Sequence, residues 1–402
     1  MNKHILYTFF VRTASTALNF LVALLFARHS GPAVKGDVTL LITIIYFFIF
    51  FSNILGGQAL VYLIPRNKVE LLVIPAYLWT VVVTLIGFVF MKTTHLIHAQ
   101  HIPAISVLSF FSSIIAIHQT ILLAKKKIST ANLIGITAVL IQLMGVLICF
   151  YFLRISDIYA FIYSSLLAYS LTAFISFLLV RHLVSFGEFK KHFTLLELKE
   201  SFRYGLLYQL AEILQLLNLR YYFFQLGLQQ GIQYLGIYSI GISILEAVWI
   251  VPRSISTVHY VTTSNSNEVQ QEAKRTVYLL KRSLLISAGI LLIIYLVPSG
   301  IYVLVFGDGF SSVKHSIRFL FPGILIYNLF IVLSSFYTGI GKYWPVIVSS
   351  LAGVLTLIAL SFFLLPKFVM SGAGLAASGS FAVASLSILI FFSLQNRKSL
   401  LS

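Results

Sequence analysis

Charged and polar residues lie within an apolar stretch, residues 204–226, that is long enough to cross a bilayer as a helix. At about 100° per residue, Gly205, Gln209, Glu212 and Arg220 fall on one helical face, within an arc of roughly 80°. A charge that faces lipid is costly, so this face is expected to point toward other helices or a water-filled cavity. Two interpretations remain open: a ligand-binding cavity, or charged pairs that only join buried helices.

A second apolar stretch, residues 234–262, carries the same kind of face. Ser239, Glu246 and Arg253 share it, and Pro252 is expected to bend the helix there. Glu246 and the Glu212 of the preceding helix are candidate carriers of a proton or cation, provided that burial favours their protonated forms. Permanent pairing of each glutamate with an arginine is an equally open alternative.

The first apolar stretch, residues 5–27, has a polar stripe that includes Arg12 and Asn19. Arg12 lies about two turns from the expected cytoplasmic end, so its side chain either lines a cavity with its polar neighbours or extends to the membrane surface.

Composition identifies the class of protein that must position these residues. The chain has 402 residues, 59% hydrophobic and only 10% charged, with a mean hydropathy of +0.97, whereas soluble domains carry about 25% charged residues. Long apolar runs favour helices over the short alternating strands of a barrel, so we expect an all-α polytopic membrane protein of about 12 transmembrane helices. The expected segments are 5–27, 38–64, 70–91, 102–124, 128–153, 157–184, 204–226, 234–262, 283–306, 315–340, 343–365 and 373–394.

The positions of Lys and Arg predict orientation. Most lie in loops on the side of both termini, which predicts that both termini are cytoplasmic. Arg28 and Lys35 are assigned to a loop on the opposite side. The formal charge is +17, and the basic residues collect in short loops, where they can contact membrane lipids. No patch of aromatic and basic residues favours binding of nucleic acid. The single cysteine, Cys149, forms no metal-ligand cluster, and no metal or cofactor is expected.

The chain also predicts a two-fold internal repeat. Shifting it by about 200 residues places the turn with Gly36 opposite the turn with Gly236, and Arg12 opposite Glu212. We therefore predict an N-terminal six-helix bundle over residues 1–184, an amphipathic cytoplasmic linker over 185–203 and a C-terminal six-helix bundle over 204–402. Six is even, so the repeats are parallel, with a site expected between them.

Three stretches carry a family resemblance: LFARHSGPAVKGDVTLL near the start, LGIYSIGISILEAVWIVPRSIST at 235–257 and GAGLAASGSFAVASLSI at 372–388. They resemble bacterial polysaccharide flippases of the multidrug/oligosaccharidyl-lipid/polysaccharide exporter (MOP) superfamily. The resemblance covers the whole chain and implies a MATE/flippase-like fold with two bundles around a basic cavity.

The resemblance implies a transporter rather than an enzyme. Its substrate would be a lipid-linked oligosaccharide on undecaprenyl pyrophosphate, moved across the bacterial inner membrane for O-antigen, lipopolysaccharide or another surface polysaccharide. Arg12 and Arg220 would attract the pyrophosphate or acidic sugars, and Asn19 and Gln209 would hydrogen-bond sugar hydroxyls. A polysaccharide polymerase and chain-length machinery are possible partners.

One departure from the family pattern concerns ion coupling. Relatives often have an acidic residue shortly after the arginine of the seventh helix, but here Tyr221 and Tyr222 follow Arg220, which shifts the coupling role to Glu212 or Glu246. Two alternative functions are a cation-coupled multidrug exporter of the same superfamily and a membrane polysaccharide polymerase or ligase. The exporter would favour an acidic cavity, and the enzyme would need a large outer loop, whereas the outer loops here are short.

Overall fold

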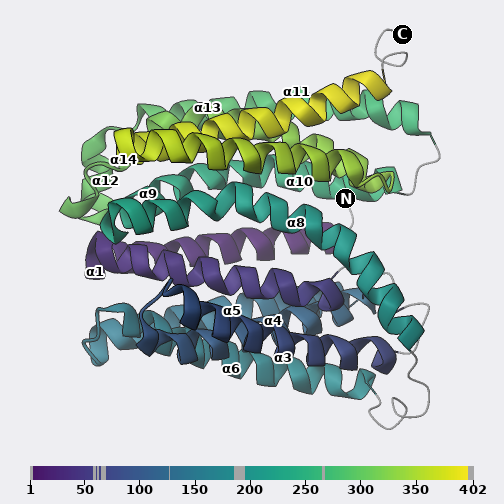
Figure 1. The fold of residues 1–402 in the computed structure, drawn as a ribbon, viewed down its shortest axis with the longest axis horizontal. Helices are drawn as coiled ribbons and strands as arrows, with labels where there is room; N and C mark the ends of the chain where they lie inside the picture. The colour runs from purple at the N-terminus through teal and green to yellow at the C-terminus, as the bar shows by residue number, and fades with distance from the viewer. Residues whose placement is uncertain are drawn as a thin grey trace. The chain divides into compact units, whose positions relative to one another are not determined.

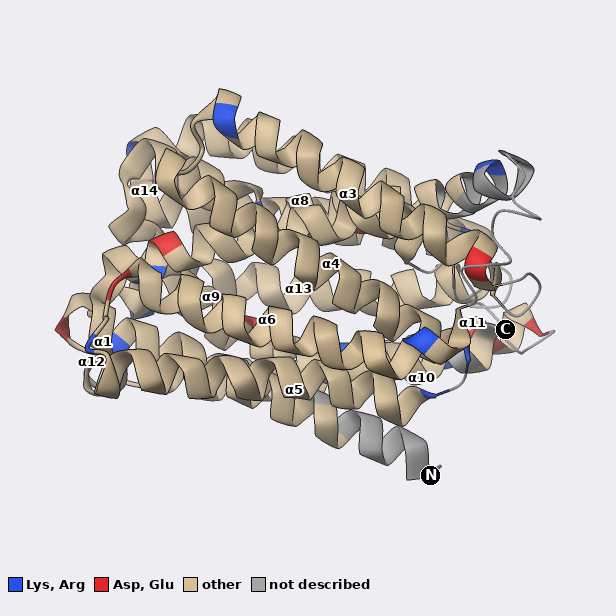
Figure 2. Ribbon diagram, turned by 90° about the horizontal axis from the view of Figure 1, so that it is seen from below, with Lys and Arg blue, Asp and Glu red and all other residues tan. Residues whose placement is uncertain are grey.

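The computed structural model describes residues 3–57, 60, 63–64, 69–125, 127–184, 195–264 and 268–396 (Figure 1). Within these ranges all regular structure is helical, as predicted, because a backbone in hydrocarbon must satisfy its own hydrogen bonds. Nine helices of the described part are long and apolar enough to cross a membrane. Figure 2 shows most charged residues toward the helix ends and long uncharged middles. The total of about twelve spans in two repeats stays a prediction.

Two of the longest helices are each broken once. α1 (Lys3–Gly56) contains Gly31 with φ 76° and ψ 178°, directly before Pro32. Glycine tolerates this positive φ, and proline suits the first turn of the helix that follows. α14 (Trp344–Gln395) is broken at Val369, three residues after Pro366. Each break lies near a predicted boundary between two spans.

The chain forms two compact units, each discontinuous in sequence. Unit 1 contains residues 1–29 and 41–210, and unit 2 contains residues 30–40 and 211–402. The predicted boundaries at 184 and 204 stay predictions. Residues 185–194 of the predicted linker lie outside the described residues, and residues 195–203 begin α8 (Leu195–Gln230).

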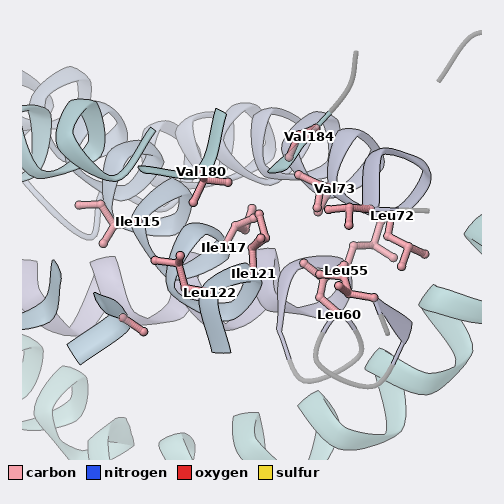
Figure 3. Close-up of a cluster of buried hydrophobic side chains, with 14 of the residues drawn as sticks. Leu55, Leu60, Leu72, Val73, Ile115, Ile117, Ile121, Leu122, Val180 and Val184 are labelled. Carbon is pink, nitrogen blue, oxygen red and sulfur yellow. The ribbon is translucent and has the colours of Figure 1, made fainter. Parts of the chain in front are cut away.

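Unit 1 is built around α4, which packs against α3, α5 and α6. Its helices besides parts of α1 and α8 are α3 (Val69–Thr94), α4 (Ile102–Ala124), α5 (Ile128–Leu147) and α6 (Ile158–Val180), with short helices Ala99–His101, Ile148–Phe152 and Arg181–Leu183. Asp157 caps α6 by accepting a hydrogen bond from the Tyr159 amide at 3.0 Å. Aliphatic side chains such as Leu72, Ile117 and Val180 form a buried core (Figure 3).

Unit 2 is built around α13 (Val313–Gly339), which packs against α9, α10, α11 and α14. These helices and the short ones between them are α9 (Ile232–Glu246), Ala247–Trp249, α10 (Ile250–Ser264), α11 (Val269–Leu296), α12 (Ser299–Phe306) and Asp308–Phe310. The buried indole of Trp249 donates a hydrogen bond to the Ile324 carbonyl at 3.0 Å. The Trp249 ring lies 5.0 Å from that of Tyr327, so aromatic packing joins the end of α9 to α13.

Candidate functional site

The centre of the candidate site is an ion pair inside unit 2. Arg220, on α8, donates from Nη1 to Glu246 Oε1 at 2.7 Å and from Nη2 to Oε2 at 3.1 Å. The two side chains are only 18% and 19% exposed. Two parallel charge-assisted bonds of this kind are strong and fix the orientation of the guanidinium.

Local structure explains why these residues meet. Glu246 is the last residue of α9, where a negative charge is disfavoured by the helix dipole, so the Arg220 guanidinium offsets that cost. The guanidinium also lies 5.0 Å from the centre of the Phe223 ring, one turn along its own helix. The ring of Tyr222 meets that of Tyr238, on α9, edge to face at 5.3 Å. Side chains of α8 and α9 therefore interlock around the pair.

The remaining predicted residues of unit 2 are Glu212 and Arg253. Arg253 lies on α10 with an exposed side chain, and its guanidinium is 5.5 Å from the centre of the Trp249 ring. Glu212 is half-buried on α8, eight residues before Arg220. Trp249 follows Glu246 by three residues, so Arg253 lies near the Arg220–Glu246 pair.

A further charged residue is Lys35, which the sequence analysis assigned to a loop. That prediction is wrong: Lys35 lies in the helix that follows Gly31 and is 5% exposed. Its ammonium donates to Thr39 Oγ1 at 2.7 Å and to Ser239 Oγ, on α9, at 3.2 Å. The loop was predicted too long because its end was set by the apolar run that begins at residue 38, whereas Pro32 suits the first turn of a helix.

Backbone contact brings Lys35 to α9. A Cβ atom built on Gly36 would overlap the carbonyl oxygen of Ile232, and one built on Gly236 would overlap that of Pro32. Small residues permit this close crossing of helices. The two glycines that the repeat alignment placed opposite each other are therefore in direct contact within unit 2.

The other predicted residues belong to unit 1. Asn19 is exposed, and its side chain donates to the Ser15 carbonyl at 2.9 Å. Gln209 is 3% exposed beside Gly57, and its Oε1 atom has no hydrogen-bond partner in the described part of the chain. Arg12 lies in α1, and its side chain is outside the described residues. The structure thus joins Arg220 to Glu246, while the substrate-binding roles of Arg12, Asn19 and Gln209 stay predictions.

The chain is similar in sequence to one protein family and in fold to several solved structures. Residues 72–314 match a family model described as polysaccharide biosynthesis protein. No curated protein sequence matches the chain. The fold is similar to that of a multidrug resistance MATE family transporter of the MOP superfamily in an inward-facing conformation. That structure has a TM-score of 0.79 and 14% identity, with 96% of this chain and 95% of that chain covered.

Two further solved structures are similar. The lipid II flippase MurJ, in an inward closed conformation, has a TM-score of 0.75 and 15% identity over 99% of this chain and 91% of that one. A MOP superfamily transporter from Pyrococcus furiosus, described by the reverse polarity of its binding pocket, has a TM-score of 0.63 and 14% identity over 99% and 96%. At these identities the likeness establishes the fold.

Proposed function

Because more than half of its length matches that family model, the chain belongs to the polysaccharide biosynthesis protein family, and we propose that it is a flippase for lipid-linked oligosaccharides. It would carry an oligosaccharide on undecaprenyl pyrophosphate from the cytoplasmic to the outer leaflet of the bacterial inner membrane. The reaction is a translocation in which no covalent bond forms or breaks.

The observation that carries this proposal is the charged region inside unit 2. A bilayer-spanning protein retains arginine, lysine and glutamate at membrane depth chiefly where they bind a substrate or an ion. Here Arg220 is fixed by Glu246 at 2.7 Å, and Lys35 is buried against Ser239, two turns before Glu246 on α9. Such cations suit a pyrophosphate better than a cationic drug.

Polar residues of unit 1 are the candidates for recognition of the sugars. Asn19 and Gln209 carry amide groups that can donate to and accept from hydroxyls. The Gln209 Oε1 atom is buried without a partner among the described residues, which supports a role in binding. Arg12 would add positive charge near the cytoplasmic surface.

Transport would proceed by alternating access, with residues 1–184 rocking against residues 204–402 and both termini in the cytoplasm. A substrate shifts such an equilibrium only by binding one state better than the other. Coupling to a proton or cation would use Glu212 or Glu246. If Glu246 carries the ion, its release from Arg220 is a required step, since the guanidinium already neutralises that carboxylate.

A multidrug exporter is the second candidate function, and the likeness to a MATE family transporter with a TM-score of 0.79 favours it. Its coupling would use the same glutamates. The two functions differ in the charge of the substrate, and that difference decides the experiment.

The test is deletion of the gene in its host, with analysis of lipid-linked repeat units, surface polysaccharide and sensitivity to cationic dyes. The strain is complemented with the wild type, Arg12→Ala, Arg220→Ala or Glu212→Gln, and with Lys92→Ala as a control for loss of an exposed charge. The flippase is supported if lipid-linked units accumulate in the strain that carries Arg220→Ala but not in the strain that carries Lys92→Ala, at equal membrane levels of the two proteins. Normal polysaccharide with increased dye sensitivity would instead establish the exporter.

A further inference from the structure

Lys35 is a buried cation whose hydrogen bonds do not use its full capacity. An ammonium group has three N–H donors. Thr39 and Ser239 accept two of them at 2.7 and 3.2 Å, and no third acceptor contacts the amine in the described part of the chain. One donor therefore remains for a further acceptor.

Both partners of Lys35 are neutral oxygens, which already take part in other bonds. Thr39 Oγ1 donates to the Lys35 carbonyl at 2.8 Å, and Ser239 Oγ donates to the Gly236 carbonyl at 2.8 Å. These hydroxyls orient the amine but do not neutralise it. No carboxylate lies within ion-pair distance of Lys35 among the described residues.

Lys35 and Arg220 differ in the charge of their partners. Arg220 has a carboxylate on both arms of its guanidinium, whereas Lys35 has only hydroxyl partners among the described residues. The positive charge of Lys35 is therefore not neutralised by these partners. In a site with little water such a charge attracts an anion more strongly than it would at the surface.

We propose that Lys35 is an anion-binding residue of unit 2, which takes an oxygen of the phosphate groups that link the oligosaccharide to its lipid. The inference rests on the proposed function and names the residue that recognises the anionic part of the substrate. An ammonium–phosphate bond is charge-assisted and stronger than a bond to a hydroxyl. The phosphate would thus accept the N–H that Thr39 and Ser239 leave unused.

The experiment measures binding of farnesyl diphosphate and of farnesol to the purified full-length protein in detergent. The variants are Lys35→Met, Lys35→Gln and Lys35→Arg, with Lys92→Met as a matched loss of an exposed lysine. Loss of one bond to a charged group, about 1.5–3 kcal/mol, corresponds to roughly 10- to 150-fold weaker binding. We expect this loss for the diphosphate with Met and Gln, and wild-type binding with Arg and with Lys92→Met.

Farnesol distinguishes recognition of the charge from recognition of the lipid, and its binding should be unchanged in every variant. Lys35→Gln retains hydrogen bonding toward Thr39 and Ser239, so it tests the charge even if Lys35→Met does not fold. Competition by phosphatidylglycerol vesicles that equals competition by the diphosphate would assign the site to a bilayer headgroup and overturn the substrate assignment.

Diphosphate binding that is equal in the wild type, Lys35→Met and Lys35→Gln overturns the role of Lys35 and leaves the proposed function standing. A wild-type protein that binds neither probe overturns both the inference and the diphosphate-linked substrate. Gene deletion and complementation test transport independently of this binding assay.

Discussion

Replacement of Gly236 by alanine tests whether the close crossing of α9 with the helix after Gly31 stabilises unit 2. The added methyl group would overlap the carbonyl oxygen of Pro32. A backbone carbonyl cannot rotate away as a side chain does, so the two helices must separate. Overpacking of this kind costs about 1–3 kcal/mol. For a unit of about 200 residues, each kcal/mol lowers the midpoint of thermal unfolding by about 2–4 °C, which predicts a fall of roughly 2–12 °C.

The assay is thermal unfolding of the purified protein in detergent, followed by tryptophan fluorescence, because Trp249 is buried inside unit 2. Gly289→Ala is the matched control, because a Cβ at Gly289 in α11 meets no atom within 4 Å. There alanine is expected to leave the midpoint unchanged or raise it, since glycine in a helix interior costs about 0.5–1 kcal/mol relative to alanine. Equal midpoints for Gly236→Ala and Gly289→Ala would refute the crossing as a source of stability.

Three further predictions use the same unfolding assay. Gly31→Ala is expected to cost about 1–2 kcal/mol, because φ is 76° there and left-handed backbone disfavours a Cβ; a stabilised variant would contradict the break in α1. Asn218→Ala removes the buried acceptor of the Ser380 hydroxyl at 2.6 Å and a donor to the Ser350 carbonyl at 2.9 Å, so a loss of about 1–3 kcal/mol is expected; the exposed Asn19→Ala should change little, and similar losses for both would refute the distinction. Arg220→Met leaves Glu246 without this bidentate partner and should destabilise by about 3–5 kcal/mol, with Arg220→Met/Glu246→Leu recovering much of the loss; a double variant as unstable as the single one would rule out the ion pair as the cause.

Hydrophobic patterning predicted much of the fold because lipid-exposed helices must be apolar along their length. The predicted segment 102–124 coincides with α4 (Ile102–Ala124). The segment 234–262 was predicted as one bent helix, and the structure divides it into α9 and α10 with a short turn of 3₁₀-helix, Ala247–Trp249, before Pro252. A proline predicts that a helix is interrupted, but it predicts the residue of the interruption less reliably, because packing against neighbouring helices decides where the turn tightens.

The candidate site was predictable only in part. Helical periodicity gave the face of Arg220 and that of Glu246, but periodicity does not identify the helix that a face meets. Arg12, Arg220 and Arg253 all lie well inside the predicted segments, so sequence alone left several pairings open. Lys35 was missed for a different reason: its charge resembled a loop signal, whereas its burial depends on the contact of Gly36 with Ile232, which is 196 residues distant in sequence.

The Arg220–Glu246 pair has a consequence for biogenesis. α8 and α9 are joined by the single residue Gly231, whose φ of 107° allows a tight reversal. Each helix alone would bring an unneutralised charge into the bilayer, at a cost of about 2.5–3.5 kcal/mol for an arginine near a helix centre. Paired at the translocon, the two charges are neutral together. These helices are therefore expected to enter the membrane as one hairpin, and Glu246→Ala should lower insertion of α8 as well as stability of the finished protein.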